Sequence, residues 1–315
     1  MQIAYQTGCG VCYQGLAEDV LASESLERQY RGQIDLIFTS PPYPLNNKKK
    51  YGNLQGQEYV DWLAGFAPIF RKYLSTNGSI VIEVGNAWEP GRPVMSTLAL
   101  EALLQFQKNG RFQLCQQFVY YNPARLPTPA QWVNVKRTRV KDSFTNLWWL
   151  ALIDDPKADN RRVLKEYSEA MQRLLKTKKY NAGKRPSEHN IGKKSFLTDN
   201  SGAIPSNVIT AVNTHSSTDY LKYCRLHDLP RHPARMPIDV AKFFIKFLTE
   251  PGDVVLDPFA GSNTTGAAAE YLERKWIAIE PNLDYVIGSQ GRFSPLHLTM
   301  EMNVEDRTKS ITDAV

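Results

Sequence analysis

The most informative segment for the fold class is Val254-Val-Leu-Asp-Pro-Phe-Ala-Gly-Ser-Asn-Thr-Thr-Gly266. Its apolar start predicts a buried strand, and residues 257–266 predict a turn that opens a helix extending to about Leu272. A second apolar run, Trp276 to Ile279, predicts a further strand that ends at Glu280. A glycine turn lets a ligand approach the backbone closely, and open α/β sheets bind ligands at the carboxyl ends of their strands. We therefore expect an α/β sheet with a ligand-binding turn at this point.

The spacing of the glycines narrows the kind of ligand. Gly261 and Gly266 do not fit the Gly-x-Gly-x-x-Gly spacing of dinucleotide-binding turns, and the absence of a following Gly-Lys-Ser/Thr argues against a phosphate-binding P-loop. Glu280 lies about one helix later, where a carboxylate can accept hydrogen bonds from ribose hydroxyls, although a carboxylate at a strand end can also be merely solvated. Strand, turn, helix, strand and acid together indicate a cofactor that contains ribose.

The same alternation of apolar strands and amphipathic helices extends over most of the chain, which predicts a mainly parallel sheet covered by helices. Strands are expected at 34–38, 79–84, within 112–121 and at 145–152, and helices at about 59–74, 94–106 and 238–248. The pair Asn77-Gly78 is expected to end the first of these helices. After residue 155 the periodicity lapses into a basic and then a Gly/Ser/Asn-rich stretch, which indicates an insertion.

Composition limits the class of protein. The chain has 315 residues, of which 42% are hydrophobic and 22% charged, so a folded protein is expected rather than a disordered one. We expect a cytoplasmic protein with no membrane partner, because neither a signal-peptide core nor an uncharged apolar run of 18 residues occurs. The cysteines are Cys9, Cys12, Cys115 and Cys224; Cys9-x-x-Cys12 lacks a second pair at zinc-site spacing, so no metal site is expected.

Positive charge is concentrated in one segment. Residues 161–194 hold eleven Lys or Arg against three Glu, a net charge of +8, while the whole chain carries +6 and the remainder therefore −2. Such a segment suggests a surface that faces a polyanion, since neutralising phosphates releases their counterions. A solvated helix and loop is the alternative that charge by itself leaves open.

A second informative tract, Thr39-Ser-Pro-Pro-Tyr43, directly follows the apolar run Ile34 to Phe38. Two consecutive prolines fix φ and have no N–H, so the carbonyl groups beside them can point outward into a site. Ser40 adds a hydroxyl and Tyr43 a flat ring that can stack on a nucleic-acid base. An ordinary proline turn at the end of a strand is the alternative explanation.

The two tracts, in this order, resemble the catalytic and cofactor motifs of the β class of bacterial DNA amino-methyltransferases. Over about residues 10–295 the chain resembles the PvuII-type N4-cytosine-specific DNA methyltransferases most. Five further segments carry this likeness: Lys49-Lys-Tyr-Gly-Asn53, Asn122-Pro-Ala-Arg-Leu-Pro127, Trp132-Val-Asn134, Arg139-Val-Lys-Asp142 and His232-Pro-Ala-Arg-Met-Pro237.

The resemblance implies an enzyme of bacterial or phage type that uses S-adenosyl-L-methionine and is built on a Rossmann-like α/β sheet with circularly permuted motif order. It divides the chain into a catalytic half (1–155), a basic target-recognition insert (156–220), a cofactor-binding half (221–295) and a polar C-terminal tail (296–315). The cofactor-binding residues that it implies are Asp257, Pro258, Phe259, Ala260, Gly261, Ser262, Thr264, Glu280, His232, Pro233 and Arg235. In one respect the chain departs from its relatives: Leu16 follows Gly15 where many of them have an acid near the adenine, so either Glu18 or Asp19 substitutes or that contact is absent.

The catalytic residues implied by the likeness are Ser40, Pro41, Pro42, Tyr43 and Glu83. The N4 amine of cytosine is a poor nucleophile because its lone pair is delocalised into the ring. The Ser40 hydroxyl and the Pro41 carbonyl could hold its protons, and Tyr43 could stack on a base that has left the duplex. Glu83 lies at the end of the expected apolar strand 79–84 and could accept the proton; a surface glutamate is the alternative.

Double-stranded DNA is the expected partner, and three clusters of basic residues are expected to bind it. They are Lys48, Lys49 and Lys50; Arg137, Arg139 and Lys141; and, in the insert, Lys184, Arg185, Lys193 and Lys194. The first cluster could instead belong to a mobile lid.

Alternative activities remain open at this stage. N6-adenine methylation is the nearest, because it is the same chemistry on another exocyclic amine; adenine enzymes usually carry Asp or Asn at the position of Ser40, so the serine favours cytosine. RNA or protein methylation is more remote. A separately acting cognate restriction endonuclease is a candidate second partner. The recognition sequence and the oligomeric state cannot be read from the sequence.

Overall fold

The computed structural model describes residues 2–43, 54, 56–194, 196–212, 218–295 and 298–300. The chain forms two compact units, one made of residues 1–158 and 207–315 and the other of residues 159–206. Within the described residues, no helix combines the length and the apolar character needed to cross a membrane.

The larger unit is built on one twisted sheet, in the order β12-β1-β2-β11-β10-β3-β4-β6-β5-β9 among the described strands. The strands are β1 (Gln2–Gln6), β2 (Gly10–Gln14), β3 (Ile34–Thr39), β4 (Leu74–Val84), β5 (Gln113–Tyr121), β6 (Phe144–Ala151), β9 (Val208–Thr210), β10 (Val254–Asp257), β11 (Lys275–Glu280) and β12 (Thr299–Met300). The central strands β2, β11, β10, β3 and β4 run parallel, and β6 lies antiparallel between β4 and β5. The predicted Rossmann-like α/β sheet is confirmed.

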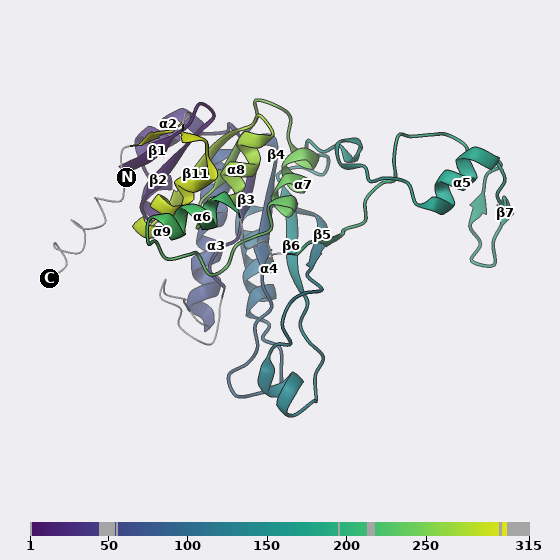
Figure 1. Cartoon of the computed structure of the whole chain (residues 1–315), viewed down its shortest axis with the longest axis horizontal. Coiled ribbons are helices and arrows are strands. Elements are labelled where there is room, and N and C mark those ends of the chain that lie inside the picture. Colours follow the sequence, from purple (N-terminus) through teal and green to yellow (C-terminus); the bar gives the residue numbers. More distant parts are fainter. Residues whose placement is uncertain are drawn as a thin grey trace. The chain divides into compact units, whose positions relative to one another are not determined.

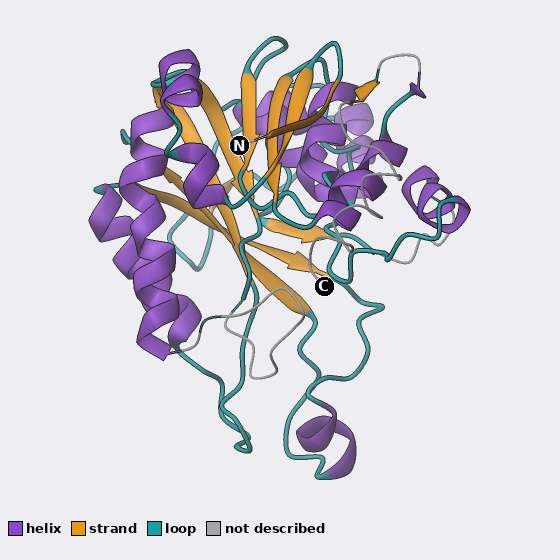
Figure 2. Cartoon of the chain, turned by 90° about the vertical axis from the view of Figure 1, so that its left-hand side faces the viewer, coloured by secondary structure: helices purple, strands orange, loops and turns teal. Residues whose placement is uncertain are grey.

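Helices cover both faces of this sheet (Figures 1 and 2). One face packs against α1 (Ala17–Leu21), α2 (Glu24–Tyr30), α3 (Gly56–Tyr73) and α4 (Leu98–Gly110), and the other against α7 (Ile238–Leu248), α8 (Thr264–Tyr271) and α9 (Leu283–Ser289), with α6 (Asp219–Leu226) against α9. Strand β3 supplies both cores because successive side chains point to opposite faces: Ile37 joins the first, and Leu36 and Phe38 the second. Burying each such side chain stabilises the fold by roughly 1.5–3 kcal/mol.

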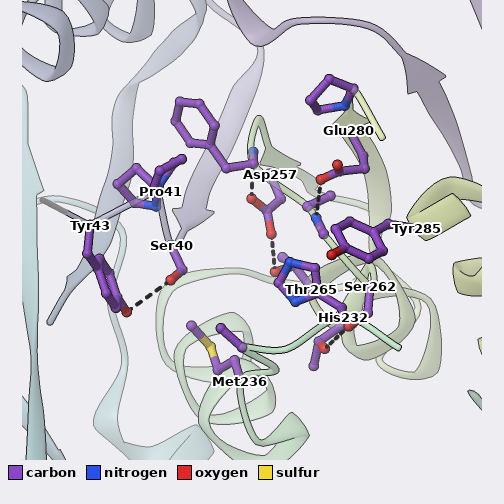
Figure 3. A pocket seen from close by; sticks show the side chains of 17 residues that line it. Ser40, Pro41, Tyr43, His232, Met236, Asp257, Ser262, Thr265, Glu280 and Tyr285 are labelled. Carbon is purple, nitrogen blue, oxygen red and sulfur yellow. Dashed lines mark hydrogen bonds between the residues drawn. The ribbon is translucent and has the colours of Figure 1, made fainter. Parts of the chain in front are cut away.

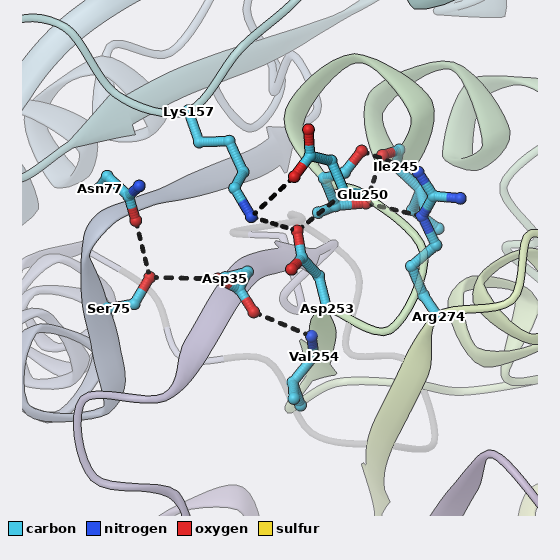
Figure 4. A network of polar contacts seen from close by, with 10 residues as sticks. Asp35, Ser75, Asn77, Lys157, Ile245, Glu250, Asp253, Val254 and Arg274 are labelled. Carbon is cyan, nitrogen blue, oxygen red and sulfur yellow. Dashed lines mark hydrogen bonds and ion pairs between the residues drawn. The ribbon is translucent and has the colours of Figure 1, made fainter.

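A polar network at the amino ends of the strands holds β3 and β10 in register (Figure 4). The Asp35 carboxylate accepts a hydrogen bond from the Val254 backbone N–H at 3.0 Å, and Lys157 forms an ion pair with Asp253 at 2.7 Å. This register sets Leu36 beside Val255 and Ile37 beside Leu256, so the residues that follow both strands meet at the carboxyl edge of the sheet.

The prediction that Asn77-Gly78 ends a helix is wrong. Helix α3 ends at Tyr73, and Asn77 and Gly78 lie inside β4, where the pairing with β3 is irregular. Gly78 approaches the Ile34 carbonyl so closely that a Cβ would lie 2.8 Å from that oxygen, and only glycine fits this approach. The next helix, expected at 94–106, is observed four residues later as α4, which begins at Leu98 after the bridge between Trp88 and Met95.

The smaller unit, residues 159–206, contains the 3-10 helix η2 (Asn160–Val163), helix α5 (Glu169–Thr177) and the hairpin of β7 (Gly183–Lys184) and β8 (Asn190–Ile191). Ser168 caps α5 by accepting a hydrogen bond from the Met171 N–H at 3.3 Å. The unit ends before residue 220, the expected end of the insert, because β9 pairs with β5 in the main sheet. Its eleven Lys or Arg and five Asp or Glu give it a net charge of +6.

Between β5 and β6, residues 122–143 extend away from the sheet and carry the short π-helix η1 (Gln131–Val135) (Figure 1). Because β5 runs parallel to β4, this segment leaves the same carboxyl edge at which β3 and β10 end.

Candidate active site

The two sequence motifs meet at the carboxyl edge of adjacent parallel strands, although 217 residues separate Ser40 from Asp257. A cavity lies between them (Figure 3). Its lining residues are Ser40, Pro41, Pro42, Tyr43, His232, Ala234, Met236, Asp257, Phe259, Ala260, Gly261, Ser262, Thr264, Thr265, Glu280, Pro281 and Tyr285.

The Asp257 carboxylate links strand β3 to the glycine turn that follows β10. Its carboxylate accepts hydrogen bonds from the Thr39 hydroxyl at 2.7 Å, the Thr265 hydroxyl at 2.6 Å and the Phe259 N–H at 3.1 Å. Burial raises the pKa of Asp257 to about 6, and the three donors oppose that rise. The side chain therefore holds β3 and the turn in a fixed relation.

Glu280 holds the other side of the turn. One of its oxygens accepts the Gly261 N–H at 2.8 Å and the other the Asn282 N–H at 2.9 Å, while burial raises its pKa to about 7. An ionised carboxylate has further lone pairs, so Glu280 can also accept hydroxyl groups from the cavity. Gly261 has a φ of +52°, and a Cβ on it would lie 2.8 Å from the His232 imidazole, so this position requires glycine.

Most, but not all, of the residues expected to bind the cofactor line this cavity. Of these residues, eight line the cavity, namely Asp257, Phe259, Ala260, Gly261, Ser262, Thr264, Glu280 and His232. Pro258 is buried but is not among the lining residues, Pro233 is exposed, and Arg235 lines a neighbouring cavity instead.

Five lining residues were missed: Ala234, Met236, Thr265, Pro281 and Tyr285. The Tyr285 ring packs edge-on against His232 at 4.7 Å between centroids. A sequence signal for Tyr285 did exist, because Asn282, two residues after Glu280, caps the helix that carries it.

Glu83 lies beside the catalytic tract. Strand β4 pairs with β3 at Thr39 and Ile82, which brings the next residues, Ser40 and Glu83, to one edge. The Glu83 side chain is 7% exposed and is hydrogen-bonded to the hydroxyls of both Ser40 and Tyr43, which lie 3.2 Å apart. Burial raises the pKa of Glu83, and these hydrogen bonds oppose the rise. The expected juxtaposition of a serine and a carboxylate is present.

Tyr43 is turned into the site. Burial, followed by the nearby Glu83 charge, holds the pKa of its hydroxyl well above the usual value. Its ring lies against Gly85, where a Cβ would come within 2.7 Å of the ring. In this arrangement the Tyr43 hydroxyl forms hydrogen bonds with Ser40 and Glu83, the two polar side chains of the tract's edge.

The departure at Leu16 has a structural counterpart. The Glu18 carboxylate accepts a hydrogen bond from the Trp62 indole at 2.6 Å, and the Trp62 ring packs 5.4 Å from the ring of Phe259, which lines the cavity. Asp19 is exposed. Of the two acids, Glu18 is therefore the one connected to this wall of the cavity.

The expected DNA-binding residues lie on exposed surfaces where they are described. Arg137, Arg139 and Lys141 belong to the 122–143 segment, and Lys184, Arg185, Lys193 and Lys194 belong to the smaller unit. Lys48, Lys49 and Lys50 lie outside the described residues. Among the described residues, no group of three or more His, Cys, Asp or Glu side chains could hold a metal ion.

The fold and this cleft are those of a DNA methylase, and the chain belongs to the N6/N4 DNA methylase family, whose model matches residues 34–290. The type II methyltransferase M.PvuII of Proteus hauseri is 41% identical over 300 residues, covering 95% of this chain and 88% of the relative. The family resemblance inferred from the motifs is confirmed.

Solved structures agree. The PvuII DNA methyltransferase (cytosine-N4-specific) superposes with a TM-score of 0.73 at 34% identity, covering 96% of this chain and 92% of that one. The putative DNA modification methylase TTHA0409 of Thermus thermophilus, solved in complex with S-adenosyl-L-methionine, has a TM-score of 0.53 at 19% identity, covering 89% and 93%. This second likeness concerns the fold alone.

Proposed function

We propose that the protein transfers a methyl group from S-adenosyl-L-methionine to the exocyclic N4 amine of a flipped cytosine in duplex DNA. The observation that carries the proposal is that Ser40, which contacts Glu83, lines the same cavity as the residues of the glycine turn. The cytosine-N4 specificity of the similar PvuII methyltransferase supports cytosine as the base.

The cavity fits the cofactor. Glu280 would accept hydrogen bonds from the ribose, and Phe259 and Pro281 offer apolar surface for the adenine. Ser262, Thr264 and His232 line the part that would take the methionine portion. The cofactor supplies an electrophilic methyl group, and the walls of the cavity would keep that group next to Ser40.

The residues beside Ser40 would activate the amine. Ser40 and the Pro41 carbonyl would accept hydrogen bonds from its two protons and draw the nitrogen toward tetrahedral geometry. As the new N–C bond formed and the sulfur–methyl bond of the sulfonium broke, with S-adenosyl-L-homocysteine as the leaving group, the nitrogen would become cationic, and Glu83 would take the surplus proton. A carboxylate with a raised pKa is a stronger base than an exposed one, which suits Glu83 to this step. The Tyr43 hydroxyl would have to release Ser40 and Glu83 before the base enters.

DNA would be held by the exposed basic residues of the 122–143 segment and of the smaller unit, and the latter would supply contacts to the recognition sequence. Flipping the cytosine costs a few kcal/mol, which stacking on Tyr43 and the new hydrogen bonds would offset. We place the enzyme in the cytoplasm, as the modification partner of a separately acting restriction endonuclease.

Methylation of adenine N6 is the second candidate, and one relative favours it. DNA adenine methyltransferase YhdJ of Escherichia coli (strain K12) is 46% identical over 61 residues, which is 19% of this chain. The short overlap and the serine at position 40 make cytosine the better supported substrate.

The test is to incubate the protein with methyl-labelled S-adenosyl-L-methionine and duplex DNA, digest the DNA and identify the labelled nucleoside. We expect N4-methylcytosine, and no label with the Ser40→Ala variant. N6-methyladenine would establish the second candidate. Label in RNA or protein but not in DNA would refute both.

A further inference from the structure

Arg292, which belongs to none of the sequence motifs, is hydrogen-bonded to the glycine turn at Ser262. It lies in the 3-10 helix η3 (Gln290–Arg292), and its guanidinium donates hydrogen bonds to the Ser262 backbone carbonyl and, at 2.9 Å, to the Ser262 hydroxyl oxygen. Burial lowers the pKa of Arg292 only to about 10, so the group is charged at neutral pH. A charged donor is thus bonded to both Ser262 oxygens.

The Arg292 guanidinium also contacts Tyr220, which is hydrogen-bonded to the cavity residue His232. Its central carbon lies 4.7 Å from the centroid of the Tyr220 ring, and the Tyr220 hydroxyl accepts a hydrogen bond from the His232 backbone N–H at 2.9 Å. Arg235 lies over the same ring at 5.9 Å. Two cations therefore flank Tyr220, next to the part of the cavity formed by Ser262 and His232.

The contact with Arg292 determines how the Ser262 hydroxyl can form further hydrogen bonds. An arginine has only donors, so the Ser262 oxygen must act as the acceptor toward Arg292, and the single hydroxyl proton points elsewhere. The Thr264 hydroxyl, at 3.5 Å, is at the outer limit of hydrogen bonding. Because Ser262 lines the cavity, its proton is available to an acceptor there. Helix α8 begins two residues later and also favours negative charge at this place.

We propose that Arg292 is a positioning residue that turns the Ser262 hydroxyl into a donor and thereby selects a cofactor with a carboxylate at its methionine end. This rests on the proposed use of S-adenosyl-L-methionine. Arg292 contacts the turn and is not among the residues that line the cavity, and it acts by fixing the direction in which the Ser262 hydroxyl donates and by adding positive potential behind it.

The experiment compares two ligands that differ only in this carboxylate, S-adenosyl-L-methionine and decarboxylated S-adenosylmethionine, binding to the full chain without DNA. We expect the wild type to prefer the carboxylate by about ten- to hundredfold, as for a hydrogen bond supported by a charge. Arg292→Met should reduce this preference toward one, mainly by weakening S-adenosyl-L-methionine. Arg292→Lys should keep part of it, and Arg225→Met, at an exposed arginine of α6, should keep all of it.

Ser262→Ala provides a second route that leaves Arg292 in place, and it keeps the test decisive should Arg292→Met not fold. It should also reduce the preference, and the double variant should lose no more than the more affected single one. Equal weakening of both ligands by Arg292→Met would assign a purely structural role and overturn the inference. Equal affinity of the wild type for both ligands would overturn it while leaving the proposed function intact; failure of the wild type to bind either would instead count against the proposed function.

Discussion

Cofactor affinity should depend on pH through Glu280. Burial raises the pKa of this carboxyl from 4.5 to about 7, and its ionised form is the one that accepts hydrogen bonds from a ribose. At one pH unit below the pKa only about a tenth of the groups are ionised in the free enzyme, and binding must first remove the proton. We therefore expect S-adenosyl-L-methionine to bind about tenfold more weakly at pH 6 than above pH 8.

Calorimetric titration between pH 5.5 and 8.5, without DNA, measures this dependence. In Glu280→Gln the affinity should be weaker at high pH and nearly independent of pH down to about 7, below which Asp257, with a pKa of about 6, becomes protonated. Glu24→Gln, at an exposed glutamate of α2, serves as the control and should behave as the wild type. Equal affinity at pH 6 and pH 8.5, or the same slope in Glu280→Gln, would refute the reasoning.

The same pKa shift predicts the direction in which folding stability changes. Because the folded carboxyl has the higher pKa, the folded state binds more protons than the unfolded state between pH 4.5 and about 7, so the free energy of unfolding falls as pH rises through this window. The shift corresponds to about 3 kcal/mol for Glu280. The Glu280→Gln variant has no carboxyl to titrate, so its free energy of unfolding should not fall with pH for this reason. Its amide has only one oxygen, so one of the two backbone N–H groups that Glu280 accepts loses its acceptor. Chemical denaturation should therefore find the variant less stable than the wild type at pH 5 and close to it at pH 8.

Three further predictions concern the amine, the base and the DNA. Glu83→Gln keeps the shape of the side chain but removes the proton acceptor, so kcat should fall about a hundredfold with the KM for S-adenosyl-L-methionine unchanged; a near wild-type rate at every pH would exclude a base. Gly85→Ala puts a methyl within 2.7 Å of the Tyr43 ring and should raise the KM for DNA, whereas Gly65→Ala, with nothing within 4 Å, should not; equal KM values would show that the ring position does not matter. Four basic side chains of the smaller unit can be replaced together by Gln: Lys184, Arg185, Lys193 and Lys194. The slope of log affinity for DNA against log salt, from fluorescence anisotropy, should then decrease by about 0.9 for each phosphate that the variant no longer neutralises, and an unchanged slope would mean that these residues do not meet phosphates.

Local signals predicted much of the fold. The strands at β3, β10 and β11 and the helix α7 were expected where they occur, since runs of apolar residues and turn residues depend on near neighbours. The error at Asn77-Gly78 has a long-range cause: Gly78 belongs to β4 because it meets the carbonyl of Ile34, a residue 44 positions earlier. A local turn signal cannot report such a contact.

The class of protein and the two tracts that form the cleft could be recognised without a structure, because a Pro-Pro turn after a strand and a glycine turn before a helix are patterns of neighbouring residues. The set of side chains that surround the cavity, and the shifts of their pKa values, became known from the folded chain. Three features depend on segments that are far apart in the chain. They are the packing of the Tyr43 ring against Gly85, the hydrogen bonds from Arg292 to Ser262, and the burial that raises the pKa of Glu280. They depend on the register of the sheet and on burial, which exist only once the chain has folded.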